Sequence, residues 1–401
     1  MTDTTHPTPS ASPSASSGAP LRAAIVGCGV IGRHHASVIT DHPGITVTAL
    51  VDTVLPAAVA LADDLEGGGA DRPVAVATLA EAFEGAEVDV VVVASPSGLH
   101  LRLAEEALEA GRHLVIEKPL DVDIARSTRF AALAREASAR GLVVTVISQH
   151  RFDPASQVVA AAAHDGRFGR LTSGVASVAW YRSQPYYDSG DWRGTWELDG
   201  GGAVMNQGVH TVDLLVWMLG RPIEISAQTA LLAHERVEIE DVAVATVRFE
   251  SGALGVIHAT TAAYPGLSVR LQVMGASGSG VIDDDRLAFF HVATTGASVG
   301  HSGVPTDESL DQSAGLVPPE HLLGGPSEPD RFRRAHSRQY DDIVGAVREG
   351  RSPGVTVDDA LLSLATVKAL YVSATLGRPV LVDDVLTGAL DDQDVTVGVR
   401  R

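Results

Sequence analysis

Lysine is scarce in this chain. Among 30 basic residues only Lys118 and Lys368 are lysines, and the others are arginines. An arginine satisfies any need for surface positive charge, whereas a lysine offers a compact ammonium whose pKa moves readily on desolvation. Lys118 stands in VIEKPL, at the end of an apolar run and directly before a proline. It is therefore a candidate for chemistry, and the alternative is an ordinary lysine at a strand end.

Cysteine, net positive charge and long apolar runs are lacking as well. Cys28 is the only cysteine, so an intrachain disulfide and a thiolate metal cluster are excluded. The formal net charge of −20 and the pI near 5.1 argue against a nucleic-acid partner and against an anionic membrane surface. No apolar run approaches the ~20 residues that a membrane span needs. We expect a cytoplasmic protein with no membrane partner.

The composition, 45% hydrophobic and 20% charged, is that of a globular protein long enough for two or three domains. Residues 1–20 are rich in Ser, Thr, Pro and Ala and lack the features of a signal peptide, so we expect a disordered tail. The remaining pattern divides into a nucleotide-binding domain at 21–148, a substrate and oligomerisation domain at 149–380, and an acidic tail at 381–401.

A glycine-rich turn follows the first apolar run, in LRAAIVGCGVIG. Gly27 would permit the tight turn, Gly29 would let the backbone approach a pyrophosphate, and Gly32 would let the next helix pack on the strand. Val30 and Ile31 of the turn are cofactor-binding candidates, and the helix-like stretch RHHASVITD that follows would present its N-terminus to the phosphates. Asp52 ends the second predicted strand, 20 residues past Gly32, where a carboxylate accepts from ribose hydroxyls and repels a 2′-phosphate. The pattern predicts NAD binding in preference to NADP.

Strand and helix patterns continue to alternate up to Ser148, which indicates a doubly wound parallel sheet. Ligands bind beyond the carboxyl ends of the strands in such a sheet. Ser95 and Pro96 stand at one of these ends, and Glu117 and Lys118 at the next. The topology alone therefore places Lys118 at the cofactor crevice.

The second half changes to period-two alternation, for example at 223–228 and 268–273, with turn signals at 264–266 and 275–278. This predicts a large, mostly antiparallel sheet with one polar face, and we expect a dimer or tetramer to form through it. Residues 291–330 read as a long loop. Two helices are expected afterwards, at 334–350 and from Thr356 to the stop signal Gly377.

One segment, DWRGTWELDGGGAVMNQGVHTVDLLVWMLG, predicts a helix from about Ala203 to Leu219. Asn206, His210 and Asp213 would share one face of this mostly apolar helix and would need partners. A buried, satisfied histidine is the alternative for His210. These spacings are not a usual zinc set, so we expect no metal. The pair His34 and His35 reads as structural.

Taken together, these motifs resemble the glucose–fructose oxidoreductase, inositol 2-dehydrogenase and rhizopine-catabolism family, Gfo/Idh/MocA. The carrying motifs are GCGVIG with Asp52, SPSGLH ending at His100, EKP at 117–119, and GGGAVMNQGVHTVD at 200–213, and the likeness runs over about 21–377. The resemblance implies a Rossmann domain, a C-terminal α/β domain with an open sheet, a nicotinamide cofactor and a sugar, cyclitol or nucleotide-sugar substrate.

The resemblance also implies roles for single residues. The EKP lysine, Lys118, would lie near the nicotinamide, and His210 would be the active-site histidine. Many members have aspartate where Asn206 stands, and the Met-Asn-Gln-Gly run is similar to that of bacterial UDP-N-acetyl-amino-sugar-uronate oxidases. His150 and Arg151 stand where members often carry a substrate-contacting arginine, so Arg151 is a candidate. Trp192 and Arg193 match another pocket-lining segment.

The expected reaction removes a hydride from a secondary hydroxyl. His210 would take the hydroxyl proton. Lys118 would donate a hydrogen bond to the same oxygen. Asn206 would orient the substrate, Asp213 would orient His210, and Pro119 would fix the strand end through a cis bond. Two alternatives stay open: a glycosidase that oxidises and re-reduces its sugar without net NADH, and a non-catalytic NAD-binding regulator.

Overall fold

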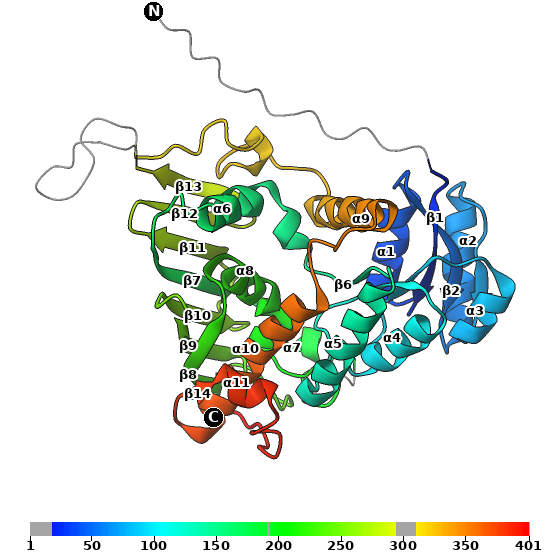
Figure 1. Cartoon of the computed structure of the whole chain (residues 1–401). Coiled ribbons are helices and arrows are strands. Elements are labelled where there is room, and N and C mark those ends of the chain that lie inside the picture. Colours follow the sequence, from blue (N-terminus) through cyan, green and yellow to red (C-terminus); the bar gives the residue numbers. More distant parts are fainter. Residues whose placement is uncertain (1–17, 191–192, 294–309, 401) are drawn as a thin grey trace, which may run out of the picture.

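The computed structural model describes residues 18–190, 193–293 and 310–400 and contains two sheets (Figure 1). A six-stranded sheet stands on the right of the view, a larger sheet on the left, and α8 (Val209–Leu219) and α10 (Val357–Leu376) lie between them. The predicted α/β fold with a Rossmann sheet and a second, mostly antiparallel sheet is confirmed.

The first sheet is parallel, with the order β3-β2-β1-β4-β5-β6, which is the order of a doubly wound dinucleotide-binding fold. Its strands are β1 (Leu21–Val26), β2 (Ile45–Val51), β3 (Val74–Val76), β4 (Val90–Val93), β5 (His113–Ile116) and β6 (Val144–Val146). The helices are α1 (Val30–Thr40), α2 (Leu55–Gly67), α3 (Leu79–Gly85), α4 (His100–Glu109) and α5 (Ile124–Ala139). The Val90–Val93 run is fully buried, as expected for a strand covered on both faces.

The second sheet has the order β13-β12-β11-β7-β10-β9-β8-β14, and β15 (Val399–Arg400) also pairs with β8. Its other strands are β7 (Leu171–Ala179), β8 (Pro222–Leu231), β9 (Val242–Phe249), β10 (Leu254–Thr260), β11 (Val269–Gly275), β12 (Gly278–Asp283), β13 (Arg286–Val292) and β14 (Val380–Leu381). Burial alternates along β9 and β10, so that Val244 and Leu254 are exposed on one face and their neighbours are buried on the other. This is the predicted period-two pattern.

The helices of the second half are α6 (Pro154–His164), the short α7 (Gln184–Tyr187), α8, α9 (Arg331–Glu349), α10 and α11 (Val382–Leu386). Of these, α6, α8, α10 and α11 cover the buried face of this sheet, while α9 packs against α1 of the first half. The predicted capping box at Thr356 and Asp359 and the left-handed Gly377 bound α10. By length and composition α10 passes as a membrane span, but two thirds of it is buried against β8, α8 and α5, so its apolar character serves the core.

Three expectations need correction. The segment after residue 380 contributes β14, α11 and β15, with Val382 and Val385 buried, because its valines alternate with acids along short elements. Part of the predicted 291–330 loop, 294–309, lies outside the described residues. The rest of that loop contains the 3-10 turn Pro319–His321 and a β-bridge from Leu322 to Leu287. The helix predicted at 334–350 begins three residues earlier, at Arg331.

Candidate active site

The glycine turn between β1 and α1 has the geometry that the motif predicts. Gly27 has φ +97°, and a Cβ there would lie 2.6 Å from the carbonyl oxygen of Ala94. A Cβ on Gly32 would lie 1.8 Å from the carbonyl oxygen of Gly27, so only glycine lets α1 pack this closely. Gly29 faces open space and Val30 is exposed at the start of α1. The N-terminus of α1 is therefore accessible to an anion.

Lys118 follows β5, and its bond to Pro119 is cis. Its backbone N–H donates to Glu117 Oε2 at 2.9 Å, and its Nζ donates to the carbonyl oxygen of Asn206 at 3.2 Å. Burial lowers the pKa of Lys118, while the carboxylates of Glu117 and Asp199 act in the opposite direction. The ammonium thus reaches from the first sheet to the helix that carries His210.

That helix begins with an unusually wide turn. Residues Ala203–Gly208 form a π-helical turn before α8, which corrects the predicted single α-helix. Instead of an N-cap side chain, the buried Glu240 accepts from the N–H groups of Gly202 and Val204 at 2.9 Å. The hydroxyl of Tyr371 accepts from the N–H of Met205 at 3.1 Å and donates to Glu240 at 2.8 Å. Burial raises the pKa of Glu240 to about 7. These partners come from the loop before β9 and from α10, and they fix the turn from outside.

The imidazole of His210 lies at the start of α8. No hydrogen bond joins either ring nitrogen to another of the described residues. Burial lowers the pKa of His210 well below 6.5, and the positive charges of Lys118 and His150 add to this effect. The ring centroid of His150 is 5.3 Å away. His210 is therefore neutral at pH 7 and has a nitrogen free to accept a proton.

Asn206 is held by an acid that the sequence reasoning missed. Its side-chain amide donates to Asp199 Oδ1 at 2.6 Å, and Asp199 Oδ2 accepts from the N–H of Gly194 at 3.0 Å. Burial raises the pKa of Asp199 to about 6, and the charge of Lys118 partly offsets this. In the sequence, the position of Asp199 directly before the three glycines was the one feature that could have marked it as a site residue.

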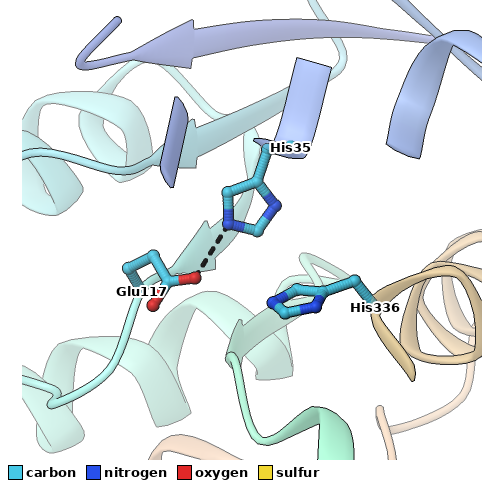
Figure 2. Close-up of side chains that lie close together, drawn as sticks. All are labelled: His35, Glu117 and His336. Atoms are coloured by element: carbon cyan, nitrogen blue, oxygen red, sulfur yellow. Dashed lines mark hydrogen bonds and ion pairs between the residues drawn. The ribbon is translucent and has the colours of Figure 1, made fainter. Parts of the chain in front are cut away.

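His35, Glu117 and His336 form a buried cluster (Figure 2), and Glu117 directly precedes Lys118 in the sequence. Glu117 Oε1 is 2.8 Å from His35 Nε2, and His35 Nδ1 is 2.9 Å from the hydroxyl of Tyr340 on α9. Burial alone would raise the pKa of Glu117, but the hydrogen bond from His35 lowers it on balance. One carboxylate oxygen thus faces His35 and the other holds the main chain of Lys118. Glu117 positions Lys118 through its main chain, and its role as a cofactor-binding residue stays a prediction.

Comparison with known proteins agrees with this geometry. Residues 21–146 match the oxidoreductase family with an NAD-binding Rossmann fold, and residues 156–281 match the GFO/IDH/MocA C-terminal domain. The chain is 31% identical to the WlbA dehydrogenase of Bordetella pertussis, whose structure holds NADH and UDP-GlcNAcA, with a TM-score of 0.72 over 90% of this chain and 98% of that one. The chain belongs to the Gfo/Idh/MocA family.

Other members of this family are similar over comparable lengths. GenD2 from gentamicin A biosynthesis, solved with NAD, is 26% identical with a TM-score of 0.72, over 93% of this chain and 99% of that one. The inositol 2-dehydrogenase of Rhizobium meliloti is 23% identical over 90% of this chain and 98% of its own length. This Gfo/Idh/MocA protein is therefore an NAD-binding oxidoreductase.

The cofactor end of the Gfo/Idh/MocA site fits a dinucleotide. Besides the open N-terminus of α1, the hydroxyl of Ser95 is buried with no hydrogen-bond partner among the described residues. Asp52 accepts from the N–H groups of Cys28 and Val54 at 2.8 Å, which holds its carboxylate beside the glycine turn. Gly27, Gly29, Gly32, Ser95 and Asp52 would hold NAD, which supplies the hydride acceptor.

Some predicted site residues of this Gfo/Idh/MocA chain lie elsewhere. His100 is buried, and its ring nitrogens lie 2.9 Å from the carbonyl oxygens of Pro119 and Ser95, so it joins the loops that follow β5 and β4. Arg151 donates two hydrogen bonds of 2.7 Å to Asp213, and its guanidinium lies over Trp217. Among the described residues, no hydrogen bond joins either of them to Lys118 or His210.

Asp213 does not orient His210. Its carboxylate accepts from Arg151, from Ser148 and from Ser363, and among the described residues no hydrogen bond joins it to His210. Asn206 lies in the wide turn that precedes α8, whereas His210 and Asp213 lie in α8 itself. The three residues therefore do not share one helical face as predicted. Trp192 lies outside the described residues. Arg193 stands over the ring of Tyr186, 4.5 Å from its centroid.

Proposed function

We propose that this protein oxidises a secondary hydroxyl of a nucleotide sugar with NAD, and that its substrate is a UDP-N-acetyl-amino-sugar uronate or a close analogue. The observation that carries the proposal is the bond from Lys118 Nζ to Asn206, one helical turn before His210. Asn206 in place of the more usual aspartate, and the likeness to a dehydrogenase bound to UDP-GlcNAcA, favour a nucleotide sugar over a free cyclitol.

The proposed chemistry follows from the two side chains. His210 is neutral, and its ring makes no hydrogen bond to the part of the chain that the structure describes, so it accepts the hydroxyl proton as general base. Lys118 donates a hydrogen bond to the same oxygen and stabilises the negative charge that develops there; a charge-assisted bond of this kind contributes about 1.5–3 kcal/mol. Asn206, fixed by Asp199, orients the sugar. Burial between the two sheets strengthens both interactions by excluding water.

The pH dependence of turnover should be bell-shaped. His210 must be neutral to act as a base, so kcat/KM should fall as the pH drops through its pKa, which burial has moved well below 6.5. Lys118 must be charged to donate, so kcat/KM should fall again as the pH rises through its pKa, which burial has moved below 10.5. A pH profile of kcat/KM measures both limbs. An acid limb at or above pH 6.5 would contradict the assignment of His210.

A substrate panel tests the function itself. Polyols, free sugars and nucleotide sugars are offered with NAD or NADP, and NADH absorbance is followed. We expect NADH in step with oxidised UDP-sugar, and NAD to be preferred because Asp52 would repel a 2′-phosphate. Free sugar released without net NADH would instead indicate the glycosidase. NAD binding without turnover of any substrate would indicate the regulator.

The proposal has a structural part as well. We propose that residues 21–148 hold the cofactor and 149–380 the substrate, and that the exposed face of β9 and β10 joins subunits. Val244 and Leu254 are about half exposed on that face, which supports an association there. Light scattering of the purified protein gives the subunit number. We expect a dimer or tetramer.

A further inference from the structure

His150 is the side chain whose ring packs against the proposed base His210. We propose that His150 is a specificity residue that binds a carboxylate of the sugar, so that the site selects a sugar acid over the matching neutral sugar. This inference rests on the proposed function and names the residue that recognises the acid group of its substrate.

The position of His150 leaves one edge of its ring available. It lies in the 3-10 turn Gln149–Phe152 after β6, with its ring plane at 76° to that of His210. Its Nδ1 is 2.8 Å from Asp153 and 3.2 Å from Asp285. No hydrogen bond joins Nε2, at the opposite edge, to another of the described residues, and 20% of the side chain is exposed. A molecule in contact with His210 can therefore reach Nε2.

The surroundings of His150 keep its imidazole positively charged. Burial by itself would lower the pKa of His150, but the carboxylates of Asp285 and Asp153 outweigh this and raise it well above 6.5. Burial by itself would raise the pKa of Asp285, but the charge and hydrogen bond of His150, and then the charges of Arg331 and Arg338, lower it. Arg338 of α9 also donates to Asp153, so both acids interact with arginine charge besides that of His150. His210, on the other side, is neutral.

A cationic donor at this point calls for an anionic acceptor. A sugar hydroxyl needs only a neutral donor, whereas a carboxylate taken out of water needs a compensating charge. Arg151, the neighbour that the sequence favoured, is committed to Asp213, and Lys118 serves the reacting oxygen. Among the described residues His150 is thus the cation in ring contact with His210. The 5.3 Å between the two rings suits two substituents on one sugar ring.

A divalent cation is the other chemistry that this cluster admits. The ligand atoms of His150, Asp153 and Asp285 lie within 4.8 Å of one another. We favour a protonated imidazole over a metal ligand for two reasons. Nδ1 of His150 makes a short contact with Asp153, and Arg338 forms an ion pair with the same carboxylate. A metal is therefore an outcome that the experiment must separate.

The experiment compares UDP-GlcNAcA with UDP-GlcNAc, which differ in a carboxylate against a hydroxymethyl group. With wild-type protein and NAD we expect kcat/KM for the acid to exceed that for the neutral sugar by on the order of 10–100-fold. In His150→Asn this ratio should shrink at least about tenfold, mainly through KM for the acid. His164→Asn, at an exposed histidine on α6, is the control and should keep the wild-type ratio.

A second variant covers the case in which His150→Asn fails to fold. Asp285 has φ +61° in the turn between β12 and β13, a conformation that asparagine also adopts readily. Asp285→Asn should keep the fold and lower the pKa of His150. As the pH is raised, His150 should then lose its proton earlier than in the wild type, and KM for the acid should begin to rise at a lower pH. KM for the neutral sugar should show no such shift.

The outcomes separate the two proposals. Equal kcat/KM for the two sugars in the wild type, or equal loss on both in His150→Asn, would overturn the role of His150 and leave the proposed function intact. Loss of activity with EDTA and its return with Zn²⁺ or Mg²⁺ would show that the cluster holds a metal, which also overturns it. If no member of the panel is oxidised, the proposed function fails and the inference falls with it.

Discussion

Lys118→Ala and His210→Ala should each lower kcat by a factor of about 100 or more while NAD still binds. Each replacement removes a group that acts on the alcohol oxygen, and neither side chain belongs to the glycine turn that would hold the dinucleotide. The measurement is steady-state turnover of the best substrate from the panel, together with NAD titration by calorimetry.

Two matched variants serve as controls for this result. Lys368→Met removes the other lysine, which lies in α10, and His164→Asn removes an exposed histidine. Both should turn over within about twofold of wild type, since neither residue touches the site. Lys118→Arg should turn over little faster than Lys118→Ala, because a guanidinium carries the positive charge but does not have the shape of the compact ammonium. Near-normal turnover in either alanine variant would show that the assignment of the two residues is wrong.

Asp213→Asn should destabilise the second half of the chain strongly. Arg151 and Asp213 are almost fully buried and form two hydrogen bonds of 2.7 Å, and removal of one partner leaves an uncompensated buried charge. Breaking such a pair costs about 3–5 kcal/mol in the free energy of unfolding. The indole of Trp217 lies against Arg151, so its fluorescence reports the unfolding locally.

The double variant Arg151→Met/Asp213→Leu distinguishes a buried ion pair from a catalytic role. Apolar residues of similar volume should restore most of the thermal midpoint, because no charge is then left without a partner. His210 should still titrate as in the wild type, since Asp213 does not contact it. A restored midpoint with an altered acid limb in the pH profile would instead give Asp213 the orienting role that the sequence suggested.

The first half of the fold was predictable because its signals are local. The glycine turn, the buried valine run of β4 and the strand-end position of Lys118 each follow from a few consecutive residues, and the sheet order then follows from alternation. The alternation in the second half gave the strands β8 and β11 in the same way.

The partners within the site were not predictable, because they come from distant segments. Asp213 looked like a companion of His210 by helical spacing, yet Arg151, sixty-two residues earlier, takes its carboxylate. The wide turn depends on Glu240 and Tyr371, which approach from the loop before β9 and from α10. His150 faces His210 while the next residue, Arg151, turns away, and sequence alone cannot say which of two adjacent side chains points inward.

The partial burial of both lysines has a practical consequence. Neither Lys118 nor Lys368 is exposed at the surface, and all other positive side chains are arginines or histidines. Reagents that acylate or reductively alkylate amines should modify the α-amino group first. A dinucleotide or substrate that shields Lys118 should slow its modification further, so labelling in the presence of NAD should preserve more activity than labelling without it.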